Sequence, residues 1–287
     1  MPTRFFVPVM RRSLHLAMLL FGLAILVWSA LQLRRPSTDR DWTADNARMP
    51  EVAFAGSAVT VKNVRNFDWQ TTTGFTPRWE DRSYDLDRLE SVWFLVEPFG
   101  DFRGPAHTFV SFGFADSLRG TDYVAVSVEL RKEVGESYHP VRGLFREYEL
   151  AYVVGDERDL VRLRSNVRRD SVFLYRVQAT PEQGRTLFRA MLERADRLRT
   201  APEFYNTLWS SCTTNIVDHV NAISPSKVPF SYKVLLPAYA DELAYDIGLL
   251  DTTRTFATLR GGALINPVAM AAHDDPDFSA RIRAGLR

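Results

Sequence analysis

HTFVSFGFADSLRGTDYVAVSVELR, residues 107–131, is the most regular part of the chain. Two runs of alternating apolar residues flank the polar sequence ADSLRGTD, a pattern typical of a β-hairpin. The apolar rows of the two strands must oppose each other on one face, and pairing Phe112 with Val124 achieves this. The same register places His107 opposite Glu129 on the more polar face. We therefore expect an antiparallel hairpin that brings a histidine beside a carboxylate.

The remaining patterns predict further strands and helices. Short β-branched or aromatic runs indicate strands at residues 59–64, 92–96, 149–154, 160–164 and 172–177. Helical spacing indicates helices over residues 181–199, from near Cys212 onward, and over residues 237–250. The tail after Asp251 is expected to be irregular, and Trp69 and Trp79 to pack beneath a loop. These elements predict an α+β fold in which helices pack against a mostly antiparallel sheet.

The N-terminal region predicts a membrane anchor. Residues 13–33 are apolar and uncharged apart from His15, and about 20 such residues span a bilayer as a helix. Arginines at positions 4, 11 and 12, with the α-amine, outweigh Arg34 and Arg35, which places the N-terminus in the cytoplasm. We expect residues 1–35 to anchor the protein in a bacterial inner membrane, residues 36–50 to be a linker, and residues 51–287 to form a periplasmic domain. A cleaved signal peptide is the alternative.

Composition excludes several classes of function. The 287-residue chain has 36 basic and 35 acidic side chains, so no long-range field attracts it to nucleic acid. Its single cysteine, Cys212, excludes an internal disulfide and a multi-thiolate metal centre, and its five scattered histidines argue against zinc. We therefore expect a globular protein that needs neither a metal nor a cofactor.

Cys212 is the candidate nucleophile. It lies in FYNTLWSSCTTN, residues 204–215, where a loop gives way to a helix. The helix dipole and the free backbone N–H groups of such a junction stabilise a thiolate and can also hold an oxyanion. The alternative is a buried structural cysteine. Candidates for binding substrate or the oxyanion are Tyr205, Asn206, Ser211 and Thr213, for which capping of the loop and helix is the alternative role.

His107 is the candidate base. A nucleophilic thiol needs a base, which can come from a distant part of the chain. His107 projects from the start of a strand, whereas His219 would lie about 10 Å from Cys212, too far for a hydrogen bond. Glu129 is the candidate to orient His107, as a carboxylate does in a catalytic triad. A structural histidine and a solvated glutamate are the alternatives.

Six sequence blocks together resemble one family of bacterial periplasmic domains, named for the Lnb lipoprotein N-acyltransferases. The blocks are NVRNFDW, PAHTFVSFGF, VAVSVELRKE, GLFREYEL, DERDLVRLRSNVR and FYNTLWSSCTTN. The likeness runs from about Asp39 into the tail and implies a circularly permuted papain-like or NlpC-like fold. It implies that His107 and Cys212 are the catalytic pair. Many relatives have asparagine where this chain has Ser211, which weakens any role assigned to that side chain and leaves the expected nucleophile unaffected.

The resemblance implies a thiol acyltransferase at the membrane surface. Cys212 would take an acyl chain from a phospholipid as a thioester and pass it to an amine such as a lipoprotein N-terminus. A periplasmic cysteine peptidase or amidase acting on cell-wall or other peptides is the alternative, and a tethered binding module without activity is a third reading. Arg158, Arg162 and Arg164 are expected either to contact lipid phosphates or to form a solvated strand face.

Overall fold

The chain divides into two units, with the boundary between Ser37 and Thr38. The computed structural model describes residues 6–100, 102–118, 120–224 and 226–286. The first unit contains helix α1 (Phe6–Gln32), in which Leu14–Gln32 is long and apolar enough to cross a membrane. A signal sequence has the same length and character. Residues 1–5 of the predicted anchor, Arg4 among them, and Arg287 lie outside the described residues.

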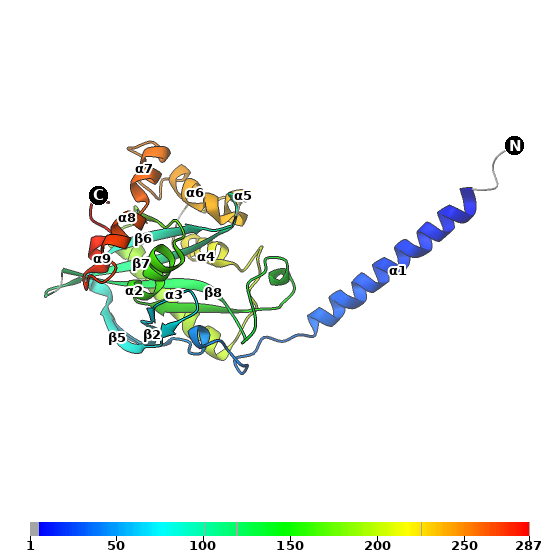
Figure 1. The fold of residues 1–287 in the computed structure, drawn as a ribbon, viewed down its shortest axis with the longest axis horizontal. Helices are drawn as coiled ribbons and strands as arrows, with labels where there is room; N and C mark the ends of the chain where they lie inside the picture. The colour runs from blue at the N-terminus through cyan, green and yellow to red at the C-terminus, as the bar shows by residue number, and fades with distance from the viewer. Residues whose placement is uncertain (1–5, 101, 119, 225, 287) are drawn as a thin grey trace. The chain divides into compact units, whose positions relative to one another are not determined.

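The second unit is built on an eight-stranded sheet (Figure 1). Its strands are β1 (Glu51–Ala55), β2 (Ala58–Arg65), β5 (Trp79–Asp85), β6 (Leu89–Pro98), β7 (Ala106–Asp116), β8 (Gly120–Arg131), β9 (Glu149–Gly155) and β10 (Phe173–Arg176). They run in the order β1-β2-β9-β8-β7-β6-β10, and β5 pairs with β2. Among the described strands only β2 and β9 pair in parallel, at Arg65 and Gly155. A small ribbon joins β3 (Asp68–Trp69) to β4 (Phe75–Thr76).

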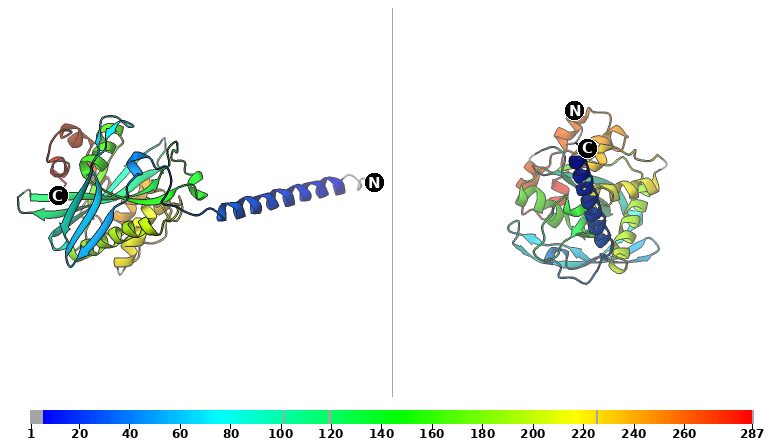
Figure 2. Two further views of the ribbon diagram at one scale, coloured as in Figure 1. Left: turned by 90° about the horizontal axis from the view of Figure 1, so that it is seen from below. Right: turned by 90° about the vertical axis from the view of Figure 1, so that its right-hand side faces the viewer.

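Helices cover both faces of the sheet (Figure 2). Helices α3 (Pro181–Thr200) and α4 (Cys212–Ile223) pack on one face; α2 (Glu157–Arg162) and α9 (Phe278–Arg281) pack on the other. The remaining helices are α5 (Tyr232–Leu235), α6 (Ala240–Asp246), α7 (Phe256–Ala263), α8 (Asn266–Ala271), the π-helix η4 (Leu163–Arg168) and the 3-10 turns η1 (Ala44–Asn46), η2 (Leu86–Arg88), η3 (Arg142–Leu144) and η5 (Pro237–Tyr239). The α+β class expected from the sequence is confirmed.

The central hairpin has the predicted register. Strands β7 and β8 pair with Phe112 opposite Val124, and Phe112 packs on Phe188 of α3. The other face differs from a solvated one, because Ser111 and Ser127 on it are completely buried. Helices α2 and α9 cover that face, so its polar side chains lie inside the protein rather than in water. A charged side chain on this face of the hairpin therefore needs a partner of opposite charge or a hydrogen-bond partner within the fold.

The strand predicted over residues 160–164 is wrong. This segment is the end of α2 and the start of η4. The Asp156 side chain caps α2 by accepting from the Arg158 N–H at 2.8 Å, and such an N-cap favours a helix over a strand. The predicted solvated strand face is wrong with it, because Arg162 and Arg164 are buried and form ion pairs with Asp68 and Glu97, each at 2.6 Å.

The C-terminal region contains more helix than expected. The helix predicted over residues 237–250 is η5 followed by α6, which ends at Asp246. Gly248 adopts a φ of 75°, a left-handed conformation that terminates helices and that glycine adopts without strain. The tail predicted to be irregular forms α7, α8 and α9 instead. Buried side chains such as Ala269 of α8 and Phe278 of α9 join these two helices to the second face of the sheet, whereas Ala263 of α7 belongs to the core on the first face.

The expected linker and the two tryptophans Trp69 and Trp79 both pack within the second unit. Much of the segment expected as a linker belongs to the second unit, since Arg131 donates to the carbonyl of Asn46 at 3.0 Å and to that of Ala47 at 3.1 Å. Trp69 and Trp79 do pack on the domain, in an aromatic cluster that includes Leu163 and Val167 of η4 and in which Trp69 contacts Phe75 at a ring distance of 4.5 Å. The Trp69 indole also donates to Asp159 at 2.8 Å.

Candidate active site

Cys212 occupies the first position of helix α4, as the sequence predicted. Ser211 precedes it as the N-cap: its hydroxyl accepts from the Thr214 N–H, and the Thr214 hydroxyl accepts from the Ser211 N–H at 2.8 Å. This reciprocal capping fixes the start of the helix. The Cys212 thiol therefore lies where the helix dipole is positive and where backbone N–H groups remain available. The side chain is buried.

His107 extends from β7 and is held by a serine and a carboxylate. Its Nε2 lies 2.7 Å from the Ser127 hydroxyl and 3.2 Å from Glu129 Oε1. The Ser127 hydroxyl itself donates to Glu129 at 2.7 Å, so it can only accept from His107. Nε2 therefore carries a proton, which it donates to Ser127. Because this nitrogen is occupied, the hydrogen bond between His107 and Cys212 is assigned to the other ring nitrogen, Nδ1. The predicted proximity of His107 and Glu129 is present, with Ser127 as an additional bridge.

The charges of the three groups reinforce one another. Burial alone would raise the pKa of the Cys212 thiol, but the hydrogen bond and positive charge of His107, with hydrogen bonds from Thr108, lower it to about 7. Burial alone would lower the pKa of His107, but the charge of Glu129 and hydrogen bonds with Cys212 and Glu129 raise it to about 10. Between these values the pair is a thiolate and an imidazolium, the reactive form of a thiol enzyme.

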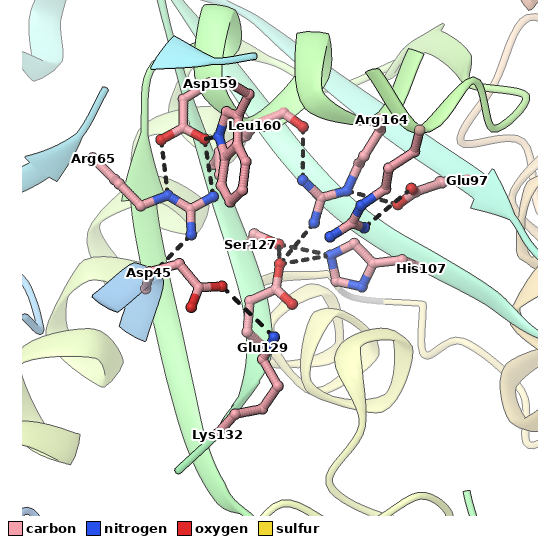
Figure 3. A network of polar contacts seen from close by, with 12 residues as sticks. Asp45, Arg65, Glu97, His107, Ser127, Glu129, Lys132, Asp159, Leu160 and Arg164 are labelled. Atoms are coloured by element: carbon pink, nitrogen blue, oxygen red, sulfur yellow. Dashed lines mark hydrogen bonds and ion pairs between the residues drawn. The ribbon is translucent and has the colours of Figure 1, made fainter. Parts of the chain in front are cut away.

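A buried arginine holds the carboxylate (Figure 3). Arg164 donates to Glu129 at 2.8 Å, to Glu97 at 2.6 Å and to the Leu160 carbonyl at 2.6 Å. Against the opposing effect of burial, the charges of His107 and Arg164 hold the pKa of Glu129 well below its usual range. Glu97 and Arg164 are almost fully buried, which restricts their side chains to this arrangement. The π-helix η4, which carries Arg164, is a type of distortion that often occurs at functional sites.

One cleft contains these groups. It has a volume of about 480 Å³, and its lining includes Cys212, His107, Glu129 and Arg164. Tyr205 and Tyr138 also line it, and burial, with the nearby Cys212 and Tyr138, raises the pKa of Tyr205, so this phenol stays protonated and can donate a hydrogen bond. Among the described residues, no group of three or more histidine, cysteine, aspartate or glutamate side chains is arranged to hold a metal ion.

Three of the predicted binding residues, Asn206, Ser211 and Thr213, make hydrogen bonds within the fold. Asn206 accepts from the Leu208 N–H at 2.9 Å, Ser211 caps α4, and the Thr213 hydroxyl lies 2.9 Å from that of Thr108. Within the described part of the chain, these three side chains do not line the cleft. The alternative role considered from the sequence, capping of the loop and helix, is the one that their contacts support for Asn206 and Ser211.

Sequence reasoning missed four residues that surround the candidate pair: Ser127, Arg164, Glu97 and Tyr138. Ser127 was within reach of prediction, because it lies two residues before Glu129 on the same strand face. Arg164 was considered only as a surface cation. Its charge partners come from β6 and β8, 67 and 35 residues away, and nothing in the local sequence indicates them.

The fold and the neighbouring thiol, imidazole and carboxylate define an α+β domain with a cleft that a cysteine lines. The chain belongs to the Lnb N-terminal periplasmic domain family, which matches it over residues 75–238. The matched region includes Cys212, His107 and Glu129. No curated protein and no solved structure matches the chain.

The pH dependence of alkylation tests the ion pair. Because a thiolate forms above the lowered pKa, the rate of Cys212 labelling by iodoacetamide should rise with pH around a midpoint near 7. In His107→Ala the midpoint should move up, since burial then acts without an opposing charge. Denatured protein, with an ordinary thiol pKa, is the control. The same midpoint in both folded proteins would contradict the pairing.

Glu129→Gln tests the orienting carboxylate. Glutamine keeps the shape of the side chain but removes the charge that raises the pKa of His107. The rate of the reaction at Cys212 should fall by about tenfold or more. The upper pH limit of that rate should shift downward, because the His107 imidazolium loses its proton at a lower pH. Glu90→Gln, on the exposed side of β6, is the matched control. Both variants should unfold cooperatively, and unchanged turnover in Glu129→Gln would remove this residue from the site.

Proposed function

We propose that this protein is a thiol acyltransferase in which Cys212 and His107 are the catalytic residues and Glu129 orients the histidine. The observation that carries the proposal is their convergence: a thiol at a helix N-terminus, an imidazole and a carboxylate line one cleft, although the chain separates them widely. The family resemblance supports the choice of acyl transfer. The lowered pKa of the thiol and the raised pKa of the imidazole support its chemistry.

The first half-reaction forms an acyl-enzyme. The Cys212 thiolate attacks the ester carbonyl of a phospholipid, and the negative charge on the carbonyl oxygen is held by backbone N–H groups at the start of α4, assisted by the Tyr205 hydroxyl. The carbon–oxygen bond then breaks, and the His107 imidazolium gives its proton to the departing lysophospholipid alkoxide. The product is a thioester on Cys212 with His107 neutral.

The second half-reaction transfers the chain to an amine. Neutral His107 accepts a proton as the amine, such as the N-terminus of a lipoprotein, attacks the thioester carbonyl. The carbon–sulfur bond breaks, the amide leaves, and Cys212 returns as a thiolate beside imidazolium. No redox partner is needed, because each step only moves an acyl group and a proton.

The two units support a proposal for the cellular location. We propose that α1 is an uncleaved single-pass anchor in the bacterial inner membrane, with the second unit in the periplasm. The apolar segment Leu14–Gln32 and the periplasmic family support this topology. Such an anchor would confine the cleft to the region where phospholipids and lipoproteins reside, and confinement raises their effective concentration.

Intact-mass analysis of protein purified from membranes tests the proposal. We expect an acyl adduct that maps to Cys212, disappears on treatment with hydroxylamine, and is absent from Cys212→Ala. Incubation with a diacylglyceryl lipopeptide should discharge the adduct onto its α-amine. Release of peptides from cell-wall material, with no lipid adduct, would instead favour a cysteine peptidase or amidase. A Cys212→Ser strain with an unchanged phenotype would favour a module without activity.

A further inference from the structure

Exposed apolar side chains gather on two loops beside the cleft. We call residues 134–145 and 206–210 the rim loops. Their large exposed hydrophobic side chains, the rim patch, are Val134, Tyr138, Val141, Phe145, Leu208 and Trp209. Trp209 is 68% exposed, whereas Trp69 and Trp93 of the same unit are buried. Exposed apolar side chains that gather on adjoining loops are typical of an interaction surface.

The two rim loops form one surface. The Thr207 N–H donates to the Gly143 carbonyl at 3.2 Å, and the Thr207 hydroxyl donates to the Pro140 carbonyl at 2.8 Å. The Asn206 amide adds a longer bond to the Leu144 carbonyl, at 3.4 Å. A Cβ at Gly143 would overlap the Thr207 hydroxyl, so the loops approach this closely only because a glycine is there.

The rim patch adjoins the mouth of the cleft. Tyr138 belongs to the rim patch and also lines the cleft, together with its neighbours Glu136 and Ser137. On the other rim loop, Trp209 precedes Cys212 by only three residues. A surface that covers the rim patch would therefore lie at the mouth of the cleft that Cys212 lines.

The chain from α1 joins the second unit at the base of the first rim loop. The Val134 N–H donates to the Asp41 carbonyl at 2.8 Å, and Trp42 pairs with Glu133. The segment from Gln32, where α1 ends, to Asp41 is nine residues, which extend to about 30 Å at most. A bilayer crossed by α1 therefore lies within that distance of the first rim loop.

We propose that the rim patch docks on the lipid surface of the membrane that α1 crosses, with the mouth of the cleft turned toward the lipids. Trp209 and Tyr138 suit this role, because amphipathic aromatic side chains prefer the interface between water and hydrocarbon. The covalent tether favours this occupant over a soluble partner, since weak apolar contacts are enough once the bilayer is held nearby. The inference rests on the proposed anchor and identifies the face through which a lipid would enter.

Spin labels on the full chain in phosphatidylethanolamine–phosphatidylglycerol vesicles test the docking. In a Cys212→Ser background, Trp209→Cys and, separately, Phe145→Cys provide single labelling sites. Leu118→Cys is the matched control, because Leu118 is 93% exposed at the hairpin tip between β7 and β8, away from His107. Oxygen concentrates in hydrocarbon, whereas a nickel chelate is excluded from it. The rate at which the label collides with oxygen, divided by its collision rate with the nickel chelate, should therefore be several-fold higher for labels at residues 209 and 145 than for the label at residue 118.

Equal ratios at all three positions would overturn the proposed docking, as would labels at 209 and 145 that are shielded from both reagents by a protein partner or a second copy. The two labelling sites guard against a local effect of replacing the tryptophan. Because these proteins lack the thiol, the result is independent of catalysis. High ratios at 209 and 145, without an acyl adduct in the unmodified protein, would support the docking and overturn the acyltransferase. Equal ratios at all positions, with an acyl adduct on Cys212, would support the acyltransferase and overturn the docking.

Discussion

Cys212→Ala should reduce acyl-enzyme formation and turnover by roughly a thousandfold or more, the scale of loss seen when a catalytic nucleophile is removed. The reason is that the thiolate has no substitute: Cys212 is the only cysteine of the chain, and alanine cannot form a thioester. The measurement is release of lysophospholipid from labelled phospholipid in detergent micelles, with the mass of the protein recorded in parallel.

The fold should survive this change. The Cys212 side chain is small and sits at the edge of the core, so its loss leaves the capping contacts of Ser211 and Thr214 in place. Thermal unfolding of the variant should therefore remain cooperative and close to that of the parent. Cys212→Ser is a second variant with nearly the same volume. Turnover retained in both would show that another group carries the reaction.

Arg164→Met should lower the free energy of unfolding by about 3–5 kcal/mol, the cost of leaving a buried charge without its partner. Arg164 is almost fully buried between Glu97 and Glu129, and methionine would leave both carboxylates without their central cation. Turnover should fall as well, since Glu129 would no longer be held against Ser127 and His107. Urea unfolding of the detergent-solubilised protein measures the first effect.

The loss of unfolding free energy in Arg164→Met should be smaller at low pH than at high pH. Burial raises the pKa of Glu97 even with Arg164 present, and removing the cation would raise it further. A carboxyl group with a raised pKa in the folded state stabilises the fold at low pH and destabilises it as pH rises. The deficit of Arg164→Met should therefore shrink as the pH falls through the pKa of Glu97, and a deficit that grows in acid would contradict the assignment.

Arg185→Met is the matched control for this experiment. Arg185 pairs with Glu182 one turn earlier on the exposed side of α3, at 2.7 Å, and Glu182 is largely exposed. Solvent-exposed pairs of this kind contribute about 0–1 kcal/mol. Equal losses of unfolding free energy in Arg164→Met and Arg185→Met would contradict the expectation that burial makes the Arg164 ion pairs important for stability.

Local patterns predicted the elements that are set by local rules. The β7–β8 register follows from two apolar rows that have to oppose each other, and only one parity satisfies both. The start of α4 follows from the serine and threonine residues around Cys212, which cap the first turn. The candidate pair of Cys212 and His107 could be proposed because few residues of either type occur in the chain, which left little choice.

Features that depend on distant partners could not be predicted in this way. Charges in residues 156–168 look like those of a solvated segment, but Asp159 pairs with Arg65, and Glu157 pairs with Arg283, 126 residues away. The same dependence explains the tail. Its short helices α7, α8 and α9 each bury a single side chain, Ala263, Ala269 and Phe278, which is too few to produce a visible period.

The two halves of the candidate site approach each other around the end of a strand. Cys212 packs with the core on the α4 side of the sheet, whereas His107 stacks on Phe109, which belongs to the core on the opposite side. Neither core alone can create the ion pair, so an unfolded chain carries a thiol of ordinary reactivity. The lowered thiol pKa therefore requires that both layers have assembled, and a misfolded copy would keep a thiol with an ordinary pKa.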